Sequence, residues 1–116
     1  MPEAKVEMSV RDVAPTVRVI DIRGEVTAFA EPVLAAAFNQ AAAGDAKAVI
    51  LNFDGMDYMN SGGIGLLVTT LIRANRNNQQ MRAFGLSDHY REILSLTRLD
   101  EAIHIFDDEA AAVEGS

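Results

Sequence analysis

The sequence of 116 residues contains no cysteine and no tryptophan. The lack of cysteine excludes a disulfide framework and any thiolate metal site, and it fits a protein of the reducing cell interior. The two histidines, His89 and His104, have no histidine or cysteine partner at the spacing that metal ligands need. We therefore expect a protein without a metal ion or any other cofactor.

Long apolar runs and an excess of basic residues are also missing. No apolar run approaches the ~20 residues that a membrane-spanning helix requires, so we expect no membrane insertion. The N-terminus has no basic region followed by an apolar core, which argues against a signal peptide and for a cytoplasmic location. The formal net charge is −7. Because nucleic-acid binders neutralise phosphates with lysine and arginine, most of this surface should repel DNA, and we expect no nucleic-acid partner.

The sequence does contain a regular succession of strand and helix patterns. Runs of β-branched and apolar residues predict strands, and apolar residues three to four positions apart predict helices. The order β-β-α-β-α-β-α-β-α predicts an α/β protein with a mixed central sheet of about five strands and about four helices. We expect one domain over residues 4–113, with flexible termini at 1–3 and 114–116. The predicted strands are 5–10, 17–24, 47–53, 81–86 and 102–106, and the predicted helices are 27–43, 61–77, 88–97 and 107–113.

The stretch Met59–Gly65 joins a predicted buried strand to an amphipathic helix. Its glycines allow a sharp turn and keep the backbone open to an approaching partner. At the helix N-terminus, the side-chain oxygens of Asn60 and Ser61 can accept hydrogen bonds from unpaired N–H groups. The free N–H groups and the helix dipole also favour an anion, so this position suits a phosphate carried by a hydroxyl. From local chemistry alone, the alternative is that Ser61 only caps the helix.

The same residues resemble a known family. The segment from Val49 to Val68 resembles the core of STAS domains, which occur in bacterial anti-sigma factor antagonists. In that family a strand and a short loop precede Asp-Ser-Ser-Gly-hydrophobic-Gly, and the corresponding residues here are Asn60–Gly65. Three further segments, 24–27, 93–100 and 103–110, extend the similarity over nearly the whole chain. The resemblance implies a single STAS-like domain.

Three positions that are polar in the family carry a different residue in this sequence. In phosphorylation-regulated members, the acceptor hydroxyl stands immediately before the first glycine of the motif, and that position is Gly62 here. The aspartate that opens the motif is replaced by Asn60, and the aspartate of the earlier Gly-x-Leu-Asp segment is replaced by Thr27. Ser61 is the only hydroxyl left in the loop, so it is the candidate for phosphorylation.

The resemblance implies a regulator that acts by binding and not by catalysis. Such a protein binds an anti-sigma factor, often a serine-protein kinase, and so frees a sigma factor for transcription. The residues expected to contact the partner are Thr27, Met59, Asn60, Ser61, Gly62 and Gly63. In one version, phosphorylation of Ser61 adds about 1.5–2 negative charges and blocks the partner. In the other, the phospho-switch is lost and the partner is bound constitutively; a second copy of the chain, as a homodimer, is a further candidate partner.

Two other functions are compatible with the sequence. By the same resemblance, the chain could be a STAS scaffold or a subunit of a transport complex. The enzyme alternative is a small α/β serine hydrolase, because residues 59–63 half-match the Gly-x-Ser-x-Gly nucleophile elbow. In that case Ser61 would be the nucleophile, and Asp100 and His104 follow it in the required order.

Overall fold

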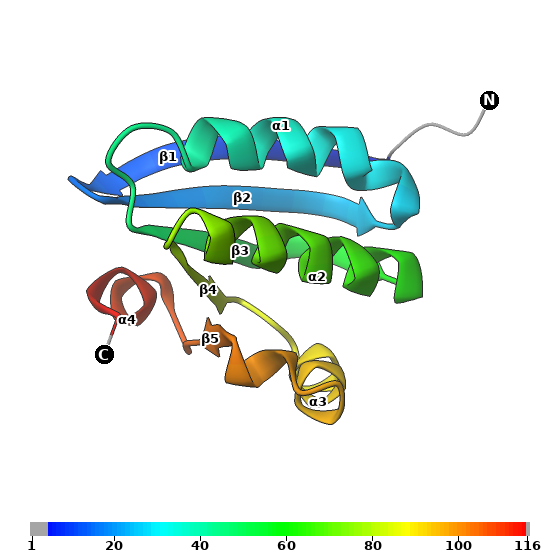
Figure 1. The fold of residues 1–116 in the computed structure, drawn as a ribbon. Helices are drawn as coiled ribbons and strands as arrows, with labels where there is room; N and C mark the ends of the chain where they lie inside the picture. The colour runs from blue at the N-terminus through cyan, green and yellow to red at the C-terminus, as the bar shows by residue number, and fades with distance from the viewer. Residues whose placement is uncertain (1–4, 116) are drawn as a thin grey trace.

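Five strands form one mixed sheet in the order β1-β2-β3-β4-β5 (Figure 1). In this computed structural model, which describes residues 5–115, β1 and β2 form an antiparallel hairpin and the other strands follow in parallel. The order of elements confirms the predicted α/β class. The strands are β1 (Val6–Ala14), β2 (Val17–Val26), β3 (Ala48–Met59), β4 (Gln80–Phe84) and β5 (Ile103–Ile105). The helices are α1 (Glu31–Ala41), α2 (Ser61–Arg76), α3 (Asp88–Leu96) and α4 (Glu109–Glu114), with 3-10 turns η1 (Ala28–Ala30) and η2 (Leu99–Glu101).

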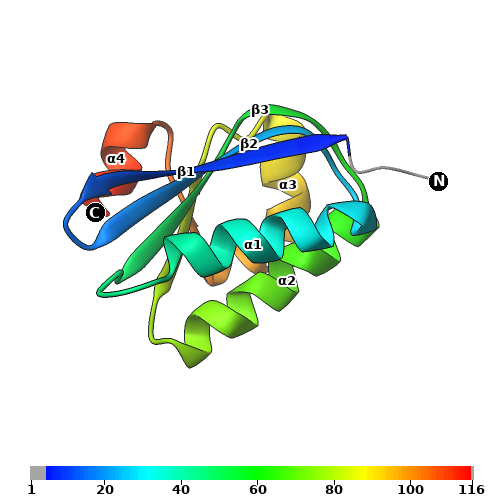
Figure 2. The same ribbon diagram turned by 90° about the horizontal axis from the view of Figure 1, so that it is seen from above.

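The sheet separates two apolar clusters of unequal size. Ile20 and Ile22 of β2 face the larger one, which also contains buried residues of α1, α2 and α3. Val17 and Val19 of the same strand face the smaller one, which is closed by Ala112 of α4. Figure 2 shows α1 and α2 on one side of the sheet and α4 on the other. Because the sheet is covered on both sides at its centre, the start of β3 is apolar at every position, as expected for a central parallel strand.

Two strands are much longer than the sequence predicted, and β2 also runs past its predicted end at Gly24, to Val26. β1 continues past Val10 to Ala14, because the polar residues there pair across the hairpin and Asp12 forms a 2.9 Å ion pair with Arg18. β3 continues past Phe53 to Met59, since it stays paired with the ten-residue strand β2 over its whole length. In β1 and β3, polar and glycine residues interrupt the apolar pattern from which the strands were predicted. Both strands nevertheless continue, because each stays paired with β2.

The ends of two helical segments also differ from prediction. The predicted helix 27–43 begins as the short turn η1, and α1 proper starts at Glu31 with a proline in its first turn. At the other end of the chain, Glu114 is the last residue of α4, and Gly115 caps that helix with φ 77°. The N–H group of Gly115 donates to the Ala111 carbonyl at 2.9 Å. Flexible ends were predicted at 1–3 and 114–116; residues 1–3 and Ser116 lie outside the described residues.

A network of charged side chains links β1, β2 and α4. Arg11 donates to the Asp21 carboxylate through Nε at 2.6 Å and to Glu109 of α4 at 2.7 Å. The amide of Asn52 donates to the same Asp21 carboxylate at 2.8 Å. The hydrogen bonds from Arg11, joined by the one from Asn52, lower the pKa of Asp21 despite its partial burial.

The stability of the fold should therefore depend on the ionisation of Asp21. Because its folded pKa lies below the unfolded value of about 3.9, Asp21 stabilises the fold above that pH. This contribution is lost as the pH falls through the folded pKa. We expect Asp21→Asn to lower the urea midpoint at pH 7 and the gap to wild type to shrink below about pH 4. Urea unfolding between pH 3 and pH 7 measures this, and a gap independent of pH would contradict it.

Candidate functional site

The segment that follows β2 and the motif loop that follows β3 meet at one end of the sheet. β2 and β3 are parallel neighbours and Val26 pairs with Met59, so the residues that follow both strands emerge side by side. The N–H group of Asn60 donates to the Val26 carbonyl at 3.3 Å. A Cβ atom at Gly63 would overlap that carbonyl and lie 2.7 Å from Cγ of Met59. Only glycine at position 63 lets α2 start this close to the ends of both strands.

Asn60 is the residue that caps α2. Its backbone is extended, with φ −109° and ψ −173°, and its Oδ1 accepts from the Gly63 N–H group at 3.1 Å. The Ile64 N–H group donates to the Asn60 carbonyl at 3.0 Å and closes the first helical turn. Ser61 follows the cap as the first helical residue, and its side chain is exposed. The capping role that local chemistry offered to Ser61 therefore belongs to Asn60, and the Ser61 hydroxyl faces solvent.

The turn η1 lies against this loop. Thr27 caps η1, because its Oγ1 accepts from the Phe29 N–H group at 3.3 Å. The Ala30 N–H group donates to the Thr27 carbonyl at 2.9 Å, and Ala30 is fully buried. A Cβ atom at Gly62 would lie 2.9 Å from the backbone nitrogen of Ala28. The structure therefore places Thr27 beside the motif loop, as predicted, and η1 fills the space that a side chain at position 62 would need.

The predicted contact residues differ in how far a partner can reach them. Ser61 is exposed, and Thr27, Asn60 and Gly62 are half-buried. Met59 and Gly63 are buried, and the Met59 side chain is only 5% exposed because it points into the core under the helices. Met59 and Gly63 therefore support the loop from below, and their contact with a partner stays a prediction.

Apolar side chains on η1 and along α2 are exposed, and the sequence did not reveal this. Phe29 on η1 is 56% exposed, and Val68 and Ile72 on α2 are 38% and 48% exposed. Gly65 lies on the same face of α2, and nothing approaches its Cα from that side. We call Gly65, Val68 and Ile72 the α2 face. A signal was present, because the apolar residues of α2 cover a wider arc than one buried face needs.

The residues of the hydrolase alternative do not come together. His104 lies in β5, and its neighbours Ile103 and Ile105 pack into the core beneath the helices. Successive strand residues point to opposite faces, so the His104 side chain lies on the face away from α2, where Ser61 is located. Asp100 lies in η2, and β4 separates β5 from β3. The geometry gives Ser61 no base among the residues that the sequence offered.

The described residues provide neither a cluster of metal ligands nor a helix that could span a membrane. Within residues 5–115, no group of three or more histidine, aspartate or glutamate side chains could hold a metal ion. In the same part of the chain, no helix is long and apolar enough to cross a membrane.

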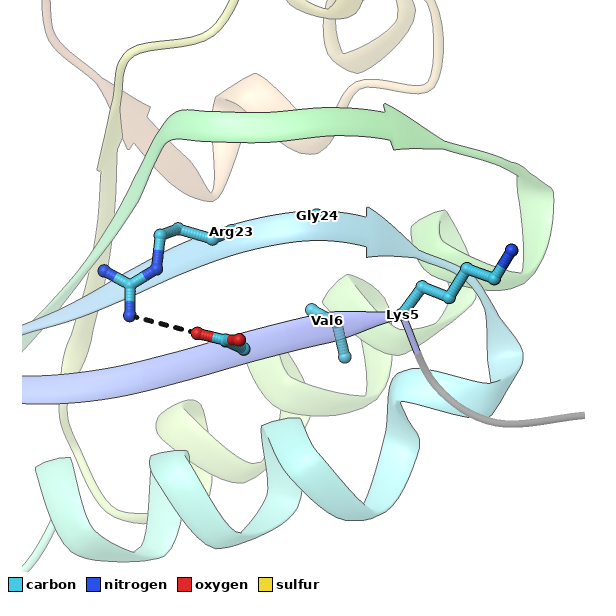
Figure 3. A pocket seen from close by; sticks show the side chains of 5 residues that line it. Lys5, Val6, Arg23 and Gly24 are labelled. Atoms are coloured by element: carbon cyan, nitrogen blue, oxygen red, sulfur yellow. Dashed lines mark ion pairs between the residues drawn. The ribbon is translucent and has the colours of Figure 1, made fainter.

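A surface cleft lies along the hairpin of β1 and β2 (Figure 3). Its volume is about 330 Å³, and it is lined by residues 5–7 and 23–24. Arg23 and Glu7 form a 3.6 Å ion pair across it, but both side chains are mostly exposed. None of the residues that line the cleft belongs to the motif loop, so the cleft is not part of the candidate site.

Known proteins are similar to this chain in sequence and in fold. The chain is 26% identical over 86 residues to the anti-sigma-B factor antagonist of Staphylococcus aureus (strain NCTC 8325 / PS 47), which covers 74% of this chain and 80% of the relative. An anti-sigma factor antagonist from Mycobacterium paratuberculosis superposes with a TM-score of 0.79 at 19% identity, over 97% of both chains. A sulfate transporter family protein from Wolinella succinogenes gives a TM-score of 0.77 at 18% identity, over 90% of this chain and 87% of that one. The sequence profile of the STAS domain matches residues 8–112, and the chain therefore belongs to the STAS domain family.

Proposed function

We propose that this protein is an anti-sigma factor antagonist of the cytoplasm. It binds an anti-sigma factor, of the serine-protein kinase type, and so frees a sigma factor for transcription. The mechanism is competition between protein surfaces and needs no catalytic group. Support comes from membership of the STAS family and from the relative in Staphylococcus aureus, which is named an anti-sigma-B factor antagonist.

The observation that carries the proposal is the exposed apolar surface of η1 and α2, the two elements that flank the motif loop. Phe29, Val68 and Ile72 lie exposed on elements whose other sides are packed into the core. Exposed apolar side chains on the elements that flank a conformationally fixed loop are typical of a protein interface. The partner would cover Ser61, Phe29 and the α2 face together, while Asn60 and Gly63 keep the loop in one conformation.

Binding at this surface could be constitutive or could be controlled by phosphorylation. The position of the usual acceptor is Gly62, and η1 occupies the space beside it, so we favour a partner that is bound without a phospho-switch. The other version uses Ser61, whose exposed hydroxyl stands at the N-terminus of α2, where an anion is favoured.

We expect no phosphate on the protein after incubation with ATP and its kinase-type anti-sigma factor. Intact-protein mass spectrometry measures this directly on wild type and on Ser61→Ala. A phosphate-sized gain in wild type that disappears in Ser61→Ala would replace the constitutive version by the switched one. The substitution removes an exposed hydroxyl that makes no hydrogen bond in the cap, so the variant should fold normally.

Identification of the partner tests the function itself. The tagged protein is used to capture binding proteins from the native cell, and each captured protein is then purified and tested for direct binding. Direct binding to an anti-sigma factor, together with release of its sigma factor, is the expected result. Capture of a membrane transporter as the direct partner would favour the transport-complex alternative. The fold similarity to the sulfate transporter family protein from Wolinella succinogenes is the reason to test it.

A further inference from the structure

Phe29 is an aromatic side chain held at the surface by a rigid support. It is 56% exposed, whereas the next residue of η1, Ala30, is fully buried. The backbone of η1 is fixed at its start by the hydrogen bond from Phe29 N–H to Thr27 and at its end by the first turn of α1. A side chain presented in this way loses little conformational freedom on binding, which favours aromatic residues as anchors of interfaces.

Gly62 holds this support in position. The missing side chain at position 62 lets Ala28 approach, and a Cβ atom there would lie 2.9 Å from the Ala28 nitrogen and 3.1 Å from its Cβ. A side chain at position 62 would therefore require η1 or the start of α2 to shift, and a shift of η1 would move Phe29 with it. The glycine at position 62, which replaces the usual acceptor residue, thus also permits the close contact with Ala28 that fixes the position of Phe29.

The charge next to Phe29 indicates what surrounds its binding pocket. Glu31 is exposed, begins α1 two residues after Phe29, and forms no salt bridge with any residue between 5 and 115. The protein as a whole carries a net charge of −7. An exposed carboxylate in a strongly acidic protein is complementary to a basic group on the surface that covers it.

We propose that Phe29 is the anchor of the partner interface, entering an apolar pocket of the partner with a lysine or arginine at its rim that faces Glu31. Gly62 is the positioning residue that sets the location of this anchor. The inference rests on the proposed function for the nature of the partner, a protein of the anti-sigma factor class. It adds the residue that carries most of the affinity and the chemistry of the pocket that receives it.

Site-specific photo-crosslinking in the native cell tests the position of the anchor. A benzophenone-bearing phenylalanine is placed at position 29, at position 72 on the α2 face, and at Ser9, which lies exposed on the opposite face of the sheet. The expected result is one anti-sigma factor crosslinked from positions 29 and 72 and not from position 9. The crosslinked peptide of that partner should line an apolar pocket and carry a basic residue.

The possible results separate the two proposals. Crosslinks to an anti-sigma factor from position 72 but not from position 29 would overturn the anchor and leave the function standing. If no anti-sigma factor is crosslinked from either position, the proposed function fails and the anchor fails with it.

Affinity for the crosslinked anti-sigma factor, measured by calorimetry, gives the size of the effect. Phe29→Ala should weaken binding by about 30-fold, as expected for a hot-spot aromatic. Phe29→Leu should retain most of the affinity, because it still fills an apolar pocket. Glu31→Gln should slow association and reduce its dependence on salt, since it removes the charge that faces the basic rim. A loss of less than about threefold in Phe29→Ala would overturn the anchor.

The role of Gly62 can be measured on the free protein. In Gly62→Ala, the amide resonances of Ala28 and Phe29 should shift, while those of β4 and β5 should stay in place. Unchanged resonances at Ala28 and Phe29 would show that position 62 does not set the location of η1.

Discussion

Gly63→Ala is expected to destabilise the protein by about 3 kcal/mol, at the upper end of the usual cost of overpacking. The new Cβ atom would overlap the Val26 carbonyl and lie 2.7 Å from Cγ of Met59. Both neighbours belong to strands of the central sheet, so neither can move without disturbing the pairing of Val26 with Met59. The hydrogen bond from Asn60 N–H to the same carbonyl would be strained as well.

Gly65→Ala is the matched control in the same helix. It adds the same methyl group two residues further on, where no atom lies within 4 Å. The change should raise stability by up to about 1 kcal/mol, because alanine is the better helix former. Urea unfolding followed by circular dichroism measures both variants. Equal effects of the two substitutions would show that the junction at Gly63 is looser than the structure indicates.

The fold was predictable because local signals agreed with the tertiary structure. Asn60 and Ser87 cap the helices that follow them, as expected for residues with short side-chain acceptors. Gly44 adopts φ 67° after α1, the left-handed position that favours glycine. Strand ends were less predictable, since β3 runs to Met59 through pairing with β2, and no local pattern records that pairing.

The candidate site was predictable only in part. The sequence placed the loop correctly, because the motif residues follow the strand and open the helix. It did not show that Met59 is buried, since the direction of the last strand residue depends on the register with β2. The exposure of Val68 and Ile72 was missed because apolar residues that recur at helical spacing are normally assigned to the core, and no such pattern includes Phe29. Only the packed structure shows that the helices leave these side chains uncovered.

The double variant Val68→Asp, Ile72→Asp is expected to weaken binding of the anti-sigma factor by about 100-fold or more. Both positions lie on the outer side of α2, one turn apart, and would be covered by the partner. Aspartate would then bring two carboxylates into an apolar contact without a matching charge, which costs far more than the loss of two methyl-bearing side chains. In the free protein both side chains are already partly exposed, at 38% and 48%, so the loss of stability should be limited to about 1–2 kcal/mol.

The control variant adds the same charge on the other side of the molecule. Ser9→Asp, His104→Asp places two carboxylates on exposed strand positions of the face opposite α2. If binding depended only on the overall charge of the protein, both double variants would weaken it equally. If the α2 face is the interface, only the first will do so, because a screened charge on the far face costs little at physiological ionic strength. Calorimetric titration of both variants at two salt concentrations therefore separates a specific docking face from general repulsion. Unchanged affinity of the variant Val68→Asp, Ile72→Asp would exclude the α2 face as the interface.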